Sequence, residues 1–498
     1  MRKSTDAPLK YLCFSSLALT LLIMATSLTA LGQVTGAATL LGVIADNTGA
    51  VVPGAEVETE NLETGVTFNA VTNDEGLYRL SGLSPGRYSL KVTAQGFAVT
   101  STPEVRLEVG QTARLDYSLT VGSLSQTIEV IASATLLNSE TTEVGQVIDG
   151  KRITEMPLNG RNYLQLAQLT AGVLPAGNVG AGSRTADEGG FVAFGQHTYQ
   201  NNVLLDGSDN SSRASGGPLG FQAQAVKPPV DAVSEFKVLT NNTSAEFGYS
   251  TGAKVIVSTK AGTNEFHGSA YEFLRNDVFD ATNFFANRAG SKKPPFKQNQ
   301  FGGTIGGPLF KSKAFFFFSY QGTLLRIGRS FTSTVPSRDI KERGDFSQQP
   351  VQRRNVYDPL LIRGSGANAL RQQFPNNTIL LNRWDPVAAA LIKLYPDPNI
   401  PGREHLTDNY FFSPTASDDA DQYDARGDYN FSDNHRFYAR YSYRKQDSVE
   451  PGPLPLPADG GLWTTTVLRG HNIRISRRWL RAWILKSARS CDYSRNCD

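Results

Sequence analysis

The chain has almost no cysteine. Among its 498 residues only Cys13, Cys491 and Cys497 occur. A disulfide framework of the kind that stabilises small secreted domains is therefore excluded for the long body of the chain. Beyond residue 31 the sequence also lacks any apolar stretch long enough for a membrane helix. Any membrane crossing after that point must use β-strands.

Motifs for catalysis, metal binding and nucleotide binding are also missing. The five histidines show no His-x-x-Glu or His-Glu-x-x-His spacing, which argues against a zinc peptidase. Two Gly-x-Ser-x-Gly matches, centred on Ser84 and Ser250, precede strand-like sequence and not the helix that a hydrolase nucleophile requires. No phosphate-binding loop or EF-hand pattern occurs. We therefore predict that the protein is not an enzyme and uses no metal or cofactor.

A nucleic-acid-binding surface is not supported either. The formal net charge is +3, but residues 471–498 hold seven Lys or Arg against two Asp, which leaves the rest of the chain at −2. No basic stripe with interleaved aromatic residues persists through the body. We therefore expect no nucleic-acid partner.

The N-terminus has the features of an export signal. Basic residues precede an apolar run over residues 12–31, which ends in small side chains. This pattern is typical of a secretory signal peptide, and we expect cleavage before Gln33, so that residues 1–32 are removed. A retained membrane helix is the alternative, but serine and threonine interrupt the run and no basic flank follows it.

Residues 37–122 show short alternating segments separated by turns, which predicts a small β-sandwich. Four motifs within it resemble those of a carboxypeptidase regulatory-like domain: residues 42–46, 52–55, 72–78 and 83–88. The resemblance implies a transthyretin-like fold. Glycan or partner binding and a rigid spacer both remain open, and we favour the spacer because no platform of exposed tryptophan is visible.

A β-prone strip follows the sandwich. It consists of Thr127, Ile128, Glu129, Val130, Ile131 and Ala132. The strip resembles the energy-coupling box of TonB-dependent receptors, and an extended segment of this kind can add as a strand to the sheet edge of a partner. An ordinary linker strand would look similar.

Two further motifs resemble the plug of Oar-like TonB-dependent receptors, over residues 124–262. The first comprises Asn159, Gly160, Arg161 and Asn162, and the second Leu205, Asp206 and Gly207. The second also makes sense as a strand that ends in an Asp-Gly turn. The resemblance implies an α/β plug and the TonB energy-coupling complex as a partner.

Residues 422–431 and 435–444 alternate aromatic or small side chains with polar or charged ones, as in an antiparallel hairpin. A soluble sandwich could bury the aromatic face, whereas an outer-membrane barrel would turn it to lipid. The export signal and the plug motifs favour the barrel. The aromatic run before them is interpreted in the same way, with Phe316, Phe318 and Tyr320 facing lipid.

We therefore expect residues 263–470 to begin an outer-membrane β-barrel. They include a long loop, residues 328–421, with one helix opened by Asp385 and Pro386 and closed before Pro396. The resemblance implies that this is an extracellular loop able to contact cargo. An insertion without such a role is an alternative of equal weight.

Residues 471–498 depart from the alternating pattern. Transporters of this class need roughly 22 strands, but only about 235 residues follow the plug. We interpret residues 471–498 as an aberrant tail after a reading-frame shift near His471, which would leave a fragment. A basic amphipathic surface helix is the alternative.

The sequence thus predicts a mainly β protein: a transthyretin-like β-sandwich, an α/β plug and an incomplete antiparallel transmembrane β-barrel. The predicted function is that of a TonB-dependent outer-membrane receptor for energy-coupled uptake of an unidentified ligand, such as a siderophore, glycan or peptide. Its sandwich and plug would face the periplasm and its barrel the outer-membrane lipid. The alternative is a cell-surface adhesion or scaffold protein that binds carbohydrate through the sandwich.

Overall fold

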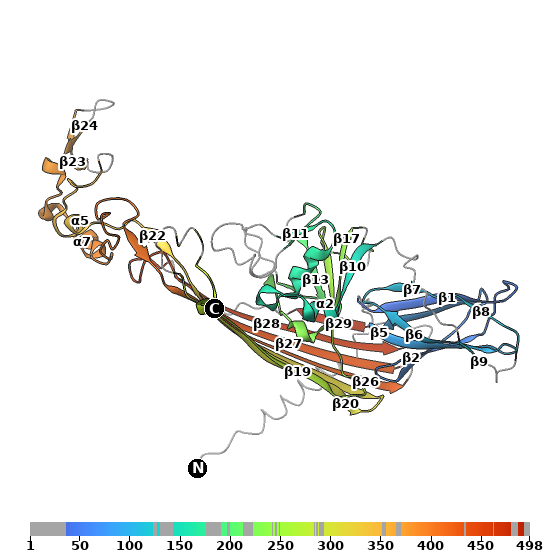
Figure 1. The fold of residues 1–498 in the computed structure, drawn as a ribbon. Coiled ribbons are helices and arrows are strands. Elements are labelled where there is room, and N and C mark those ends of the chain that lie inside the picture. The colour runs from blue at the N-terminus through green and yellow to red at the C-terminus, as the bar shows by residue number, and fades with distance from the viewer. Residues whose placement is uncertain are drawn as a thin grey trace, which may run out of the picture.

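The computed structural model has three parts, which Figure 1 shows as a sandwich, a plug and a curved sheet beneath the plug. The described residues are 36–122, 127–129, 143–175, 191–196, 200–212, 223–241, 243–244, 247–248, 250–282, 284, 287, 293–350, 355–364, 370–432, 435–461, 463–479 and 487–492. The expected signal peptide and Val130 to Ala132 lie outside them. Within these ranges no helix is long and apolar enough to cross a bilayer.

The sandwich, residues 36–122, consists of two sheets around one core. Its strands are β1 (Ala38–Asp46), β2 (Glu56–Asn61), β3 (Val66–Val71), β4 (Leu77–Leu83), β5 (Gly86–Thr93), β6 (Val99–Leu107), β7 (Thr112–Arg114) and β8 (Tyr117–Leu119). One sheet has the order β3-β2-β5-β6, and in the other β1 pairs with β4, β7 and β8. Alternate side chains such as Leu40, Tyr88 and Leu90 are buried between them, as the period of two along a strand requires.

The plug, residues 143–262, is a five-stranded sheet covered by short helices. The sheet has the order β10-β17-β18-β13-β14. These strands are β10 (Val144–Asp149), β13 (Asn202–Leu205), β14 (Ser208–Asp209), β17 (Val233–Asn241) and β18 (Lys254–Thr259). The helices are α2 (Gly150–Glu155), η1 (Asn159–Arg161), η2 (Tyr163–Leu169) and η4 (Val230–Ala232). Short strands complete it: β11 (Val173–Pro175), β12 (Phe191–Ala193), β15 (Ser211–Ser212) and β16 (Ala223–Gln224).

The curved sheet, which we call the wall, contains seven antiparallel strands in chain order. They are β19 (His267–Asn276), β20 (Phe296–Phe310), β21 (Ala314–Gly328), β26 (Thr415–Ser432), β27 (His435–Glu450), β28 (Thr464–Trp479) and β29 (Ser487–Asp492). Among the described strands the first and last do not pair, so the wall is open. The predicted mainly β fold and the predicted hairpin are confirmed, and both hairpin strands are longer than expected.

The segment between β21 and β26 extends beyond the end of the wall that lies far from the sandwich (Figure 1). It contains β22 (Phe331–Ser333), α5 (Arg338–Arg343), β23 (Tyr357–Arg363), β24 (Leu370–Gln373), η7 (Pro375–Asn377), η8 (Leu381–Arg383), α7 (Pro386–Ile392) and β25 (Tyr410–Phe412). The predicted helix is confirmed as α7, whose cap Asp385 accepts hydrogen bonds from the backbone N–H groups of Val387 and Ala388. The short helix α5 was not predicted.

Two predicted boundaries in the wall are wrong. The loop does not extend to residue 421, because β26 already pairs with β21 from Thr415. The change expected at His471 falls inside β28, which pairs residue by residue with β27 as far as Trp479. Alternation also continues there, since Asn472 and Arg474 are buried towards the plug while Ile473 and Ile475 are exposed.

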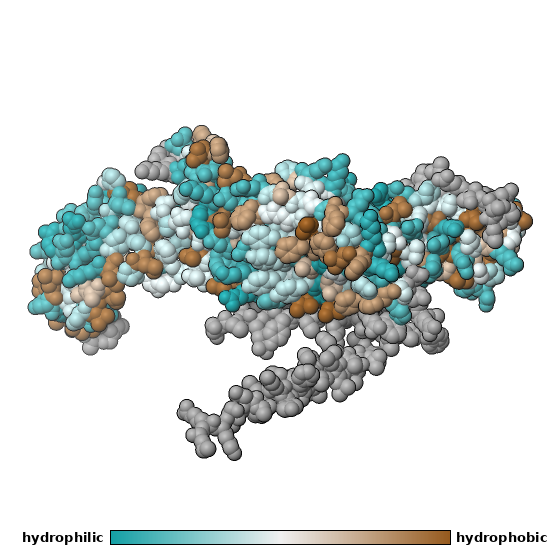
Figure 2. Space-filling model, turned by 90° about the horizontal axis from the view of Figure 1, so that it is seen from below, coloured by the Kyte–Doolittle hydropathy of each residue, from teal (hydrophilic) through white to brown (hydrophobic). Residues whose placement is uncertain are grey.

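The face of the wall turned away from the plug carries the exposed aromatic and aliphatic side chains. Figure 2 shows hydrophobic residues gathered in patches over the middle of this side. Phe318 on β21 is 40% exposed there, whereas its neighbour Phe317 is 2% exposed and faces the plug. A row of rings crosses five strands, with neighbouring centroids 4.9–6.3 Å apart: Phe301, Tyr320, Tyr423, Tyr443 and His471. Aromatic bands of this kind are typical of membrane barrels at the lipid interface.

Candidate functional site: the interface between plug and wall

The plug packs against the inner face of the wall through polar and charged side chains. Arg440, Arg474 and Asp424 on this face are each at most 4% exposed. A buried charge is costly unless it is paired and hydrogen-bonded. The contacts that compensate these charges therefore decide how firmly the plug is held.

Asp206 is the centre of the first group of contacts. It follows β13 in a tight turn, with a positive φ of 47°, and Gly207 continues the turn with a φ of 81°. The turn aims the carboxylate at the end of β18, where Thr259 donates to it from its backbone N–H at 2.8 Å and from its hydroxyl at 2.7 Å. The predicted Asp-Gly turn after a strand is confirmed.

Two arginines of the wall reach the same carboxylate. The Nε of Arg440 on β27 lies 2.8 Å from Asp206 Oδ2, and the Nη1 of Arg426 on β26 lies 3.9 Å from Oδ1. Burial by itself would raise the pKa of Asp206, but the two guanidinium groups and the hydrogen bonds from Thr259 outweigh it and hold that pKa below its ordinary value. The plug therefore presents a buried anion to two wall cations.

The arginines are held in place by further polar contacts. Arg440 donates to the Asn472 side chain at 2.7 Å and to the Leu205 carbonyl oxygen at 3.2 Å. Arg426 makes a bidentate pair with Asp428 at 2.9 and 3.0 Å, and donates to the Thr259 carbonyl oxygen at 3.1 Å. A guanidinium group with its donors fixed in this way is preorganised for one orientation of the plug.

Arg161 makes the second group of contacts, with the first strand of the wall. Its guanidinium group lies over the rings of Tyr271 and Phe273 on β19, 4.5 and 4.1 Å from their centroids. It also forms an ion pair with Asp231 of η4. Gly160, with a φ of 64°, allows the chain to turn there, so the predicted motif places a cation between a carboxylate and two rings.

The other members of this motif support the turn. Asn162 is fully buried and its side chain accepts a hydrogen bond from the Leu164 N–H at 3.2 Å, which caps η2. Asn159 donates its N–H to the Gln165 side chain at 3.1 Å. The Gly160 carbonyl oxygen accepts from Gln300 of β20 at 3.1 Å.

The plug and the wall also meet through their backbones, at Gly470 on β28. A Cβ atom added to Gly470 on β28 would lie 1.8 Å from the Ala225 carbonyl oxygen of the plug. Only glycine fits at this distance. Nearby, the side chain of Asn472 donates to the Asp209 carbonyl oxygen at 3.2 Å.

The predicted site residues fall into two places. Both plug motifs lie at the interface with the wall, although each contacts different strands. Thr127, Ile128 and Glu129 do not lie there, because they form β9 (Thr127–Glu129), which pairs in parallel with β6 of the sandwich. The sequence analysis missed Arg440 and Asn472 of the wall and Thr259 and Asp231 of the plug, although charged residues on the polar face of a predicted strand were a signal for some of them.

Comparisons with known proteins agree with this architecture. Residues 39–120 match the family Carboxypeptidase regulatory-like domain, and residues 258–482 match the family Outer membrane beta barrel domain. The TonB-dependent transporter Oar of Myxococcus xanthus is 26% identical over 294 residues, which are 56% of this chain and 26% of the relative. The chain thus spans about a quarter of the length of that curated relative, whose name describes a transporter.

Solved structures with a similar arrangement include two outer-membrane proteins. The outer membrane transporter YddB of Escherichia coli has a TM-score of 0.43 and 12% identity, covering 68% of this chain and 37% of that one. A mutant of the ferric enterobactin receptor of Pseudomonas aeruginosa has a TM-score of 0.39 and 14% identity, covering 68% and 38%. The two matched families and the Oar relative thus make the chain similar to TonB-dependent outer-membrane receptors that carry an N-terminal carboxypeptidase regulatory-like domain.

Proposed function

We propose that the chain acts in energy-coupled uptake of a ligand across the outer membrane, with the plug as the movable element. The observation that carries the proposal is the buried ion pair between Asp206 of the plug and Arg440 of the wall. An ion pair across the interface holds the plug in one position, yet it breaks without any change to either fold. Such a contact suits a plug that must be both secure and displaceable.

Coupling would act through residues 127–132. Three of them already adopt strand geometry as β9, and Glu129 is the last. Pairing of backbone groups with an extended strand of the TonB protein needs no particular side chains. A pull on this segment is transmitted along the chain towards β10, the first strand of the plug.

The long segment between β21 and β26 supports an outward-facing role in ligand contact. It lies at the end of the wall opposite the sandwich (Figure 1). If the sandwich and the plug face the periplasm, this segment faces the exterior, where cargo arrives. The cargo itself stays unidentified.

Binding of the purified periplasmic domain of the TonB protein to the detergent-solubilised chain tests the coupling step. We expect Ile128→Pro to abolish binding, because proline removes a backbone donor and breaks strand pairing. Ile128→Ala keeps the backbone donors and should bind like the wild type. If the proline variant also binds normally, the uptake proposal fails and the adhesion or scaffold alternative gains support.

A further inference from the structure

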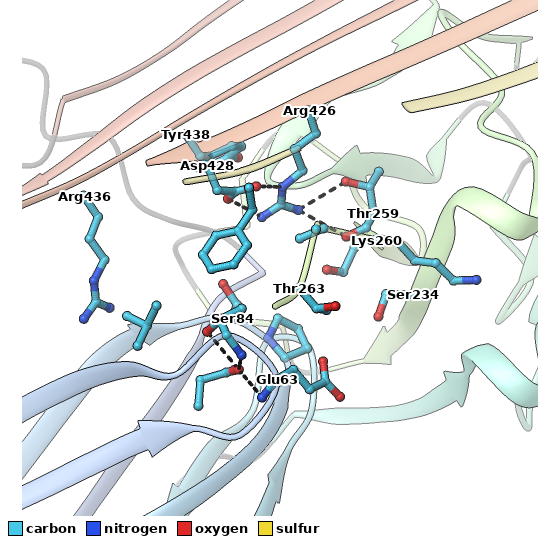
Figure 3. Close-up of a pocket in the computed structure, with 18 of the residues that line it drawn as sticks. Glu63, Ser84, Ser234, Thr259, Lys260, Thr263, Arg426, Asp428, Arg436 and Tyr438 are labelled. Carbon is cyan, nitrogen blue, oxygen red and sulfur yellow. Dashed lines mark hydrogen bonds and ion pairs between the residues drawn. The ribbon is translucent and has the colours of Figure 1, made fainter. Parts of the chain in front are cut away.

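The sandwich, the plug and the wall surround a common cavity of about 730 Å³. Figure 3 shows its lining, with Glu63 and Ser84 from the sandwich, Thr259 and Lys260 from the plug, and Arg426 from the wall. Side chains from all three parts point towards one space. The sandwich is therefore no detached spacer, and its contacts with each of the other parts can be examined in turn.

The sandwich inserts one apolar side chain into the plug. Val109, in the loop between β6 and β7, is fully buried in a small cluster with Leu239, Phe247 and Ile256 of the plug. This cluster is separate from the main plug core. A single valine thus serves as the apolar anchor of the contact.

Polar groups of β17 hold the backbone on both sides of that valine. Glu235, 3% exposed, accepts a hydrogen bond from the Val109 N–H and lies 3.7 Å from the guanidinium group of Arg106. Lys237 donates from its Nζ to the Gly110 carbonyl oxygen at 3.1 Å. Two ionisable side chains of the plug are therefore used to bind one loop of the sandwich.

A second set of contacts joins the sandwich to the wall. Arg436 on β27 lies over the ring of Phe68 on β3, 3.4 Å from its centroid, and donates to the Thr67 carbonyl oxygen. Asn264, just before β19, donates its N–H to the Glu63 carbonyl oxygen at 3.0 Å. A Cβ atom placed on Gly65 would lie 3.0 Å from Ser312 Oγ, in the turn between β20 and β21.

The segment proposed for energy coupling starts on the sandwich itself. β9 is the edge strand of the sheet β3-β2-β5-β6-β9, with Ser101 of β6 opposite Glu129. A pull applied beyond residue 129 therefore loads the sandwich as well as the plug, because β9 is paired with β6 on the N-terminal side of that point.

We propose that the sandwich is a strap that fastens the plug to the wall, and that pulling on the coupling segment detaches this strap before the plug moves. The proposal rests on the proposed coupling role of residues 127–132. One buried valine and a few polar contacts hold the sandwich on the plug, whereas the plug core contains many buried apolar side chains. The strap is consequently the weakest joint along the path of the load.

Single-molecule pulling tests the order of events without any TonB protein or ligand. The chain, with Cys491→Ser and Cys497→Ser, is reconstituted in a supported bilayer and pulled by an atomic force microscope from a labelling peptide inserted after residue 132. We expect a first rupture at low force, followed by unfolding of the plug. In the Gly65→Cys/Ser312→Cys double variant, oxidation should remove this first rupture and a reducing agent should restore it.

The comparison of the oxidised and reduced forms of one variant separates locking from any strain at Gly65. Arg436→Ala should lower the force of the first rupture, whereas Arg444→Ala, on the same face of β27 but bonded to Gln446, should leave it unchanged. The proposal is overturned if the disulfide does not form in the folded chain, or if the first rupture is the same in the oxidised and reduced forms. Neither result would affect the TonB-binding experiment.

Discussion

Asp206 of the plug and Arg440 of the wall form an ion pair at 2.8 Å in which the two side chains are 7% and 0% exposed. Removal of one partner leaves the other charge buried and uncompensated, which costs about 3–5 kcal/mol. We therefore expect Asp206→Asn to lower the free energy of unfolding by roughly that amount. Chemical denaturation in detergent micelles, followed by tryptophan fluorescence, measures it. Asp74→Asn, in an exposed turn of the sandwich, is the matched control and should change little.

Arg161 tests the second group of contacts. Arg161→Lys keeps the positive charge but loses the planar group that stacks on Tyr271 and Phe273. We expect faster backbone hydrogen exchange in residues 159–163, with exchange in the sandwich unaltered. Arg152→Lys, on the exposed side of α2, should leave the exchange pattern as it is. Equal protection in both variants would show that the stacked rings do not fix the plug.

Glu235 should make the contact between sandwich and plug depend on pH. Burial raises its pKa from 4.5 to about 7, against the lowering effects of the Val109 N–H and Arg106, while Glu108 adds to the rise. Because the docked state holds the proton more tightly, its stability is greatest below pH 4.5 and falls as the pH rises to about 7. The loss amounts to ~3 kcal/mol at most.

Thermal unfolding at pH 5.5 and pH 8 measures this effect. The wild type should lose more stability at pH 8 than Glu235→Gln, which cannot ionise. An identical pH dependence in the two proteins would contradict the assignment of the shift to Glu235.

Gly427 tests which solvent the outer face of the wall meets. A Cβ atom added there would find only the Phe315 carbonyl oxygen, at 4.0 Å, so side chains fit without a clash. In lipid, Gly427→Arg should cost about 2–4 kcal/mol, as charged residues do near the bilayer midplane. Gly427→Leu should be neutral or stabilising. Urea titrations of the chain folded into lipid vesicles compare the two, and equal stability would mean that this face is in water.

Much of the fold follows from alternation in the sequence, and the exceptions have local causes. The strands around Tyr423 and Tyr441 are predicted because aromatic and charged side chains alternate without interruption. The strand β6 is not, because Pro103 interrupts it, and the pairing of β5 with β6 shifts register opposite this position. The early start of β26 is missed since Asp418, Asp419 and Asp421 place carboxylates on both faces of this segment, a pattern that a loop shares.

The site is predictable only in part, for a different reason. Asp206 and Arg161 stand in recognisable motifs, but their partners are distant in the chain. Nothing local in the sequence says that Arg440 approaches Asp206 rather than Asp424, which lies on the neighbouring strand. Only the packing of the plug against the wall decides between them, and the same holds for Glu235 and Val109.

The aromatic row on the outer face also indicates how the strands of the wall are tilted in the bilayer. Tyr320, Tyr423, Tyr443 and His471 are direct partners on neighbouring strands, so the line through them is perpendicular to the strands. Barrel strands tilt by about 40° from the membrane normal. The depth of the rings in the bilayer therefore changes by roughly 9 Å along the row, over three strand spacings of about 4.8 Å.

The next outward-facing residue on each strand agrees with such a change in depth. On β26, β27 and β28 the next outward residue towards the long loop is already charged: Asp421, Lys445 and Arg469. On β21 Gly322 and Leu324 come first, and Arg326 follows. The lipid boundary is therefore crossed later along β21, and Tyr320 lies deeper in the bilayer than His471.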